Sequence, residues 1–103
     1  MIADSGRTVV TSTVHAWAEP EPTRMVWLAD CLARHLAGDW GDLDANDRAA
    51  NDHALRHRPG RLLSTYELPG DLAVATTEQQ LWGITDDLED SDAATTSLWR
   101  SDY

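Results

Sequence analysis

A short segment between two predicted helices gathers the side chains most able to do chemistry. Residues 38–44 have the sequence Gly-Asp-Trp-Gly-Asp-Leu-Asp, and His35 precedes them by about one helical turn. Carboxylates beside an imidazole could hold a divalent cation that activates water, as in a metal-dependent hydrolase. The aspartates could instead accept backbone hydrogen bonds, and Trp40 could fix the segment to the core or anchor a partner. We favour the interpretation in which the aspartates cap backbone N–H groups and Trp40 fixes the segment to the core. The candidate partner contacts in this segment are Asp39, Trp40, Asp42 and Asp44.

Calcium is a further possibility for this segment. Asp42, Asp44 and Asn46 stand at the first, third and fifth positions of an EF-hand loop. That loop needs glycine at its sixth position and glutamate at its twelfth, where this chain has Asp47 and His53. We therefore do not expect calcium.

Four possible zinc ligands are spaced in pairs. Cys31 and His35 are four residues apart on one predicted helix, and His53 and His57 are four apart on the next. Side chains at i and i+4 share a helical face, so two packed helices could assemble one thiolate and three imidazoles around zinc. The simpler interpretations are apolar packing of Cys31 and a hydrogen bond from His35 to the loop 39–42. We expect no metal and no cofactor.

A second acidic cluster lies near the C-terminus. Residues 86–92 hold five carboxylates and no basic residue. Crowded like charges repel each other, so such a cluster is either a solvated loop or a surface for a partner or an ion. It could imitate a row of phosphates and enter the nucleic-acid groove of another protein. The candidate contacts are Asp86, Asp87, Glu89, Asp90 and Asp92.

The net charge of −10 favours this interpretation. The chain has eighteen acidic residues, eight arginines and no lysine, and residues 59–103 alone carry nine acids and two arginines. Nucleic-acid affinity depends on cations that neutralise phosphates, so direct binding to nucleic acid or to an anionic membrane is not expected. A basic protein surface would be attracted. The alternative is that the charge serves solubility alone.

Sequence motifs of the common enzyme classes are missing. The chain has no glycine-rich phosphate loop, no His-Glu-x-x-His and no nucleophile elbow. Cys31 with a histidine and an aspartate could form a triad, but Cys31 stands among apolar residues of a predicted helix, where a thiol is inert. The sequence therefore predicts a protein that is not an enzyme.

The elements that position these residues follow from periodicity and turn chemistry. β-branched residues predict a strand at 7–14, which Pro20 and Pro22 end. Apolar residues at helical spacing predict a helix over 23–37, with Thr23 as N-cap and Gly38 just past its end. Asp44 is the predicted N-cap of a second helix over 45–56, whose alanines would approach the first helix closely.

Three further strands complete the prediction, at 61–68, 80–85 and 93–100. The expected fold class is α+β, a mainly antiparallel four-stranded sheet packed by two helices in the order β-α-α-β-β-β. Trp82 is expected in the sheet core, and Trp99, near a chain end, at the surface as either a surface contact or a dimer patch. With 103 residues the chain is one expected domain over 1–103, with 1–6 disordered.

The expected location is the cytoplasm. The N-terminal residues lack the pattern of a secretory signal, and no run of about 18 apolar residues would cross a membrane. The single cysteine, Cys31, allows no internal disulfide.

Residues 34–103 resemble a family of small bacterial proteins common on plasmids, phages and other mobile elements. Its most specific piece is the Gly-Asp-Trp-Gly-Asp-Leu run at 38–43. The chain departs from the family in its wholly acidic residues 86–92 and its long segment 71–79. Other matching pieces, in order, are Arg34-His35, Asp47, Asn51, Ala54-Leu55, Arg61-Leu62-Leu63-Ser64, Tyr66, Leu68-Pro69, Trp82, Ile84-Thr85, Thr95-Thr96 and Asp102-Tyr103.

The resemblance implies a genomic setting but no activity. Small mobile-element proteins often inhibit host defence, so an anti-CRISPR or anti-restriction role follows by analogy. We therefore predict a non-enzymatic inhibitor, monomeric or homodimeric, that acts as a DNA mimic on a basic nucleic-acid-binding surface of the host. The alternatives are a metal-dependent hydrolase built on residues 39–44 with His35, and a structural or antitoxin-like dimer.

Overall fold

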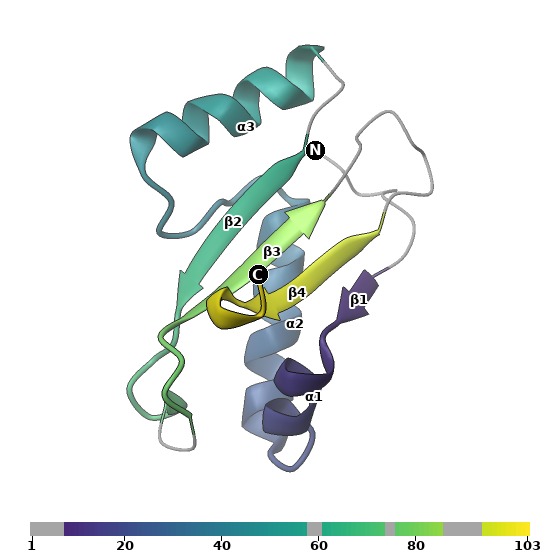
Figure 1. Cartoon of the computed structure of the whole chain (residues 1–103), viewed down its shortest axis with the longest axis vertical. Helices are drawn as coiled ribbons and strands as arrows, with labels where there is room; N and C mark the ends of the chain where they lie inside the picture. The colour runs from purple at the N-terminus through teal and green to yellow at the C-terminus, as the bar shows by residue number, and fades with distance from the viewer. Residues whose placement is uncertain (1–7, 58–60, 74–75, 86–93) are drawn as a thin grey trace.

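The computed structural model describes residues 8–57, 61–73, 76–85 and 94–103 (Figure 1). The fold class is α+β, as predicted, but the described residues form three α-helices where two were expected. The elements in chain order are β1 (Thr8–Val10), α1 (Ser12–Ala18), α2 (Pro22–Leu36), α3 (Ala45–His57), β2 (Leu62–Glu67), β3 (Gln80–Thr85), β4 (Thr95–Trp99) and a short 3₁₀ helix, η2 (Arg100–Asp102).

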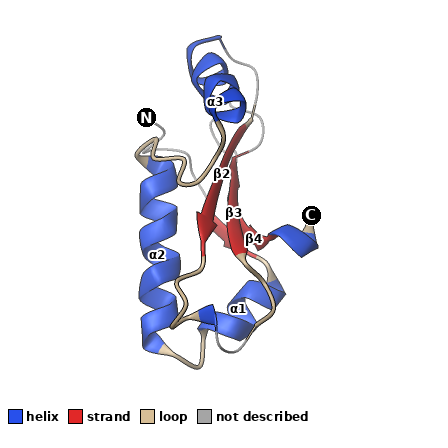
Figure 2. Ribbon diagram, turned by 90° about the vertical axis from the view of Figure 1, so that its left-hand side faces the viewer, coloured by secondary structure: helices blue, strands red, loops and turns tan. Residues whose placement is uncertain are grey.

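The four strands form one mixed sheet in the spatial order β1-β4-β3-β2. β2, β3 and β4 make the expected antiparallel meander, with Ser64 opposite Gly83 and Gly83 opposite Ser97. β1 instead runs parallel to β4, so the sheet is not purely antiparallel. Figure 2 shows α2 along one face of the sheet and the C-terminal turn on the other side.

The predicted strand over 7–14 is wrong beyond its first residues. The strand covers Thr8–Val10 of the described residues, and Ser12–Ala18 is helical. Val14, Trp17 and Ala18 are buried at spacings of three and four residues, which suits a helix against the sheet. Burial of this stripe outweighs the β-preference of the β-branched residues, since strand propensity depends strongly on context.

The central helix α2 begins at Pro22 rather than after the predicted N-cap Thr23, since proline is well suited to the first helical position. It ends at Leu36, and Gly38 follows with φ of 86°, the left-handed conformation expected past the helix end. Its buried residues are Leu28, Cys31 and His35.

The main core lies between α1, α2 and the sheet. Trp17 meets the edges of two other tryptophans, with ring centroids 6.0 Å from Trp27 and 5.2 Å from Trp99. Trp99 is 3% exposed, so the expectation that it lies at the surface is wrong. Trp82 is half-buried on the opposite face of the sheet, where its ring lies 5.4 Å from that of Tyr103, and not in the core as expected.

Helix α3 starts at Ala45 and packs on β2. It does not pack closely against α2, although the alanines of the predicted second helix suggested that contact. Only Asn51 and Ala54 of α3 are buried. A second, smaller core forms beneath it from Trp40, Leu43, Ala54 and Leu62. Residues 38–44 therefore stand between α2, α3 and the edge strand β2.

Candidate functional site

The segment 38–44 is bound to the edge of β2 as a short extra strand. Gly41 pairs with Thr65 in a parallel bridge. The Thr65 N–H donates to the Trp40 carbonyl at 3.2 Å, and the Asp42 N–H donates to the Thr65 carbonyl at 2.8 Å. The Glu67 N–H donates to the Asp42 carboxylate at 3.0 Å. The backbone of the predicted site thus supports the sheet.

Gly41 makes this close approach possible. Its φ is 70°, and a Cβ there would lie 2.0 Å from the Thr65 carbonyl oxygen. Only glycine combines a left-handed backbone with the absence of a side chain. The sequence pattern indicated that Gly41 is a loop residue, whereas in the structure it allows the backbone to contact β2.

Asn51 closes the next part of the same edge. Its side-chain amide donates to the Leu63 carbonyl at 2.6 Å and accepts from the Leu63 N–H at 3.1 Å. Asn51 is 3% exposed, so both bonds are shielded from water. Between them, Asn51 and the segment 40–42 occupy the outward backbone groups of β2, which would otherwise invite pairing with another chain.

The three aspartates of the segment are exposed, yet each accepts a hydrogen bond within the fold. Asp39 pairs with Arg34 at 2.7 Å and accepts from the Gly41 N–H at 3.1 Å. The Arg34 hydrogen bond is the main cause that lowers the pKa of Asp39. Asp44 accepts from the Asp47 N–H at 2.8 Å, as an N-cap does. The remaining carboxylate oxygens of these three aspartates are open to solvent.

Trp40 is 4% exposed and lies in the small core, with its ring centroid 5.7 Å from that of His35. The indole therefore fixes the segment to the core, which is the interpretation of Trp40 that the sequence favoured. A partner that approaches this edge would meet the carboxylates and not the indole.

His35 belongs to a closed polar network and does not donate to the loop 39–42 as expected. Its Nδ1 lies 2.7 Å from Ser64 Oγ and its Nε2 lies 2.9 Å from Thr85 Oγ1. Thr85 Oγ1 lies 2.7 Å from Thr95 Oγ1. His35 is 1% exposed, and burial lowers its pKa to about 4, so the imidazole is neutral at pH 7. The hydrolase hypothesis needs His35 beside the carboxylates, but both of its ring nitrogens are bonded elsewhere.

The four possible zinc ligands fall into two groups. Cys31 and His35 are buried under the sheet, and burial raises the pKa of the Cys31 thiol to about 12, which keeps it protonated. His53 and His57 are exposed on α3. Within the described ranges, no group of three or more histidine, cysteine or acidic side chains could hold a metal ion.

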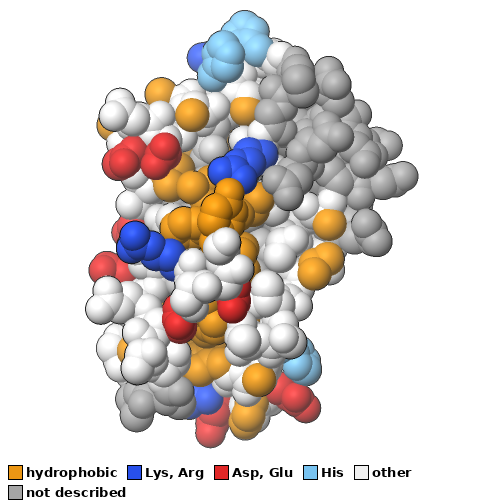
Figure 3. Space-filling model, viewed as in Figure 1, with side chains coloured by type: hydrophobic (Ala, Val, Ile, Leu, Met, Phe, Trp, Pro, Cys, Tyr) orange, Lys and Arg blue, Asp and Glu red, His pale blue; other side chains and the backbone are white. Residues whose placement is uncertain are grey.

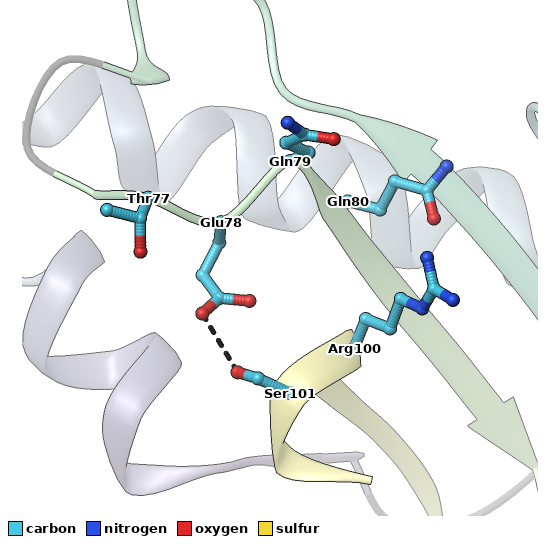
Figure 4. A pocket seen from close by; sticks show the side chains of 6 residues that line it. All are labelled: Thr77, Glu78, Gln79, Gln80, Arg100 and Ser101. Atoms are coloured by element: carbon cyan, nitrogen blue, oxygen red, sulfur yellow. Dashed lines mark hydrogen bonds between the residues drawn. The ribbon is translucent and has the colours of Figure 1, made fainter.

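An open hollow of about 400 Å³ lies between the segment before β3 and the C-terminal turn (Figure 4). The Ser101 hydroxyl crosses it to donate to the Glu78 carboxylate at 2.8 Å. A second hollow of about 410 Å³ shares these two residues and reaches Arg24 on α2. The described lining residues of both hollows include no imidazole and no thiol.

The second acidic cluster, Asp86, Asp87, Glu89, Asp90 and Asp92, lies outside the described residues. No helix among those described is both long and apolar enough to span a membrane. No family model, curated protein or solved structure matches the chain.

Proposed function

We propose that this chain is a non-enzymatic acidic interaction protein, which acts in the cytoplasm and occupies a basic nucleic-acid-binding surface of a host defence complex. The mobile-element resemblance supports the defence setting. The charge of −10 supports the choice of surface, because an acidic protein is drawn to the basic grooves that bind phosphates.

The observation that carries the proposal is the shortage of ionic partners for the carboxylates. Every described carboxylate except Glu78 belongs to an exposed residue. Across the described residues, Arg34–Asp39 is the one arginine–carboxylate pair within 4.0 Å. The negative surface charge is thus little neutralised by the protein's own cations.

Several arginines support the fold instead. Arg24 donates to the Trp17 carbonyl at 2.9 Å, and Arg61 donates to the Tyr103 hydroxyl at 2.7 Å. Arg48 donates to the carbonyls of Leu43 and Gly41. Figure 3 shows several acidic side chains along the margins of the open sheet face, with hydrophobic side chains along its middle. The exposed carboxylates are accessible to a basic partner, which would have to break only the Arg34–Asp39 ion pair among the arginine–carboxylate pairs of the described residues.

The test is competition with nucleic acid on a purified RNA-guided effector complex. The chain should displace labelled target DNA. The variant D86N/D87N/E89Q/D90N/D92N, which removes five charges near the C-terminus, should displace it at least tenfold less well.

The matched control removes five exposed charges elsewhere, as E19Q/E21Q/D30N/D52N/D71N, and should lose less than threefold. Equal loss in both variants would indicate that net charge alone is responsible. No displacement by the native chain at about 0.1 M salt, where screening is moderate, would reject the proposal for that class of complex.

A dimer is the second candidate, because β1 is an edge strand to which no other described strand pairs on its outer side. All three residues of β1 are exposed, with Val9 at 43% and Val10 at 37%. Beside them, Met25 on α2 is 42% exposed, and an apolar hollow of about 140 Å³ lies between the two elements. A mass that rises with concentration in the native chain, but not in V9T/M25Q, would support pairing through this edge. A constant monomeric mass would reject it.

A further inference from the structure

Helix α3 carries an exposed pair of imidazoles that take part in no hydrogen bond between described residues. His53 and His57 are one turn apart and exposed, whereas the helix buries Asn51 and Ala54. Their ring centroids are 4.5 Å apart, at an interplanar angle of 41°. Figure 3 shows imidazole side chains together at the top of the molecule, where Figure 1 places α3.

This separation suits two imidazoles on one metal ion. A Zn–N bond of about 2.0–2.1 Å places the ion roughly 3.2 Å from each ring centroid. For N–Zn–N angles of about 90–109°, the centroids then lie about 4.5–5.2 Å apart. The observed 4.5 Å lies at the lower end of this range, so the separation of the two rings is compatible with one shared ion.

We propose that His53 and His57 form a two-ligand site for a borderline transition cation, Zn²⁺, Ni²⁺ or Cu²⁺. Imidazole nitrogen is a ligand that these ions prefer, whereas Ca²⁺ and Mg²⁺ prefer oxygen. The chain's charge of −10 raises the local concentration of cations. The described residues offer no third ligand to the pair, so water completes the coordination.

The site would clamp the end of a helix that is held to the rest of the molecule mainly through β2. The ion bridges consecutive turns and therefore binds the helical form in preference to an unwound one. Binding should accordingly slow amide exchange in the last turn of α3.

The experiment titrates the full chain with ZnCl₂ at pH 7.5 and follows the imidazole ¹H–¹⁵N signals. We expect one ion per chain, with shifts at both His53 and His57. H53Q and H57Q should each bind at least tenfold more weakly. The control H15Q removes an exposed histidine that also has a possible ligand one turn away, Glu19 at 3.8 Å, and should bind within twofold of the native chain.

Three results would overturn the proposal. One is equal zinc affinity in H57Q and the native chain. Another is loss of binding in H15Q. The third is displacement of zinc from the imidazoles by equimolar CaCl₂, which would assign the cation to carboxylates. Circular dichroism of each variant checks that α3 is intact, and substitution at these exposed positions leaves the core untouched.

Discussion

Acidification should destabilise this protein through His35. The imidazole is 1% exposed, and its two ring nitrogens face the hydroxyls of Ser64 and Thr85. Burial lowers its pKa from 6.5 to about 4. Between these values the unfolded chain binds a proton that the native chain does not, so stability falls as the pH falls.

The size of the effect follows from the shift. At 1.36 kcal/mol for each pKa unit, the loss between pH 7.5 and 4 is about 3 kcal/mol. That is a large part of the roughly 5–15 kcal/mol that holds a domain of this size folded. The lowered pKa of Asp39 acts in a different window, since its contribution is present above 3.8 and is lost only below that pH.

Urea denaturation followed by tryptophan fluorescence, at pH values from 4 to 7.5, measures this loss. The native chain should lose about 3 kcal/mol across the range. H35Q should be less stable at pH 7.5 but nearly independent of pH, whereas H15Q should keep the native slope. A slope in H35Q equal to that of the native chain would refute the assignment to His35.

Three further predictions concern the edge of β2. Replacing Asn51 with alanine leaves both backbone groups of Leu63 unpaired and should cost about 2–4 kcal/mol in urea denaturation, with faster amide exchange at Leu63. Gly41→Ala should lower the free energy of unfolding by more than 3 kcal/mol in the same assay, because backbone strain and a clash of the new Cβ combine. Gly38→Ala should lower it by about 1–2 kcal/mol, because a Cβ there would have no neighbouring atom nearer than 4.0 Å. Asp44→Ala should cost about 1 kcal/mol and fray the start of α3, measured by amide exchange in its first turn; no change in that turn would contradict the capping role.

Much of the fold could be predicted because local signals and burial agree. The strands β2 and β3 were predicted at 61–68 and 80–85, and Gly38 and Asp44 marked helix ends through backbone chemistry that is local. The helix α1 could not be predicted from its first residues, because Thr-rich β-branched sequence favours a strand. Only the longer spacing of Val14, Trp17 and Ala18 indicates a helix, and this pattern is short because it ends just before Pro20.

The site was harder to predict than the fold. The motif at residues 38–44 drew attention for its carboxylates, yet its main contact is backbone pairing with Thr65, which depends on how the chain folds back. Asn51 was overlooked as an edge-closing residue, although a polar residue three positions before the buried Ala54 was a usable signal. The partners of His35 could not be identified, since Ser64 and Thr85 are 29 and 50 residues away in sequence.

Occupation of a basic nucleic-acid-binding surface is tested most directly by one affinity measurement. The chain's dissociation constant for a purified RNA-guided effector complex is measured with and without saturating target DNA, at about 0.1 M and about 0.5 M salt. We predict binding that weakens at least tenfold at the higher salt and is abolished by the DNA. Binding that persists with the DNA bound, or that is indifferent to salt, would contradict the proposed function.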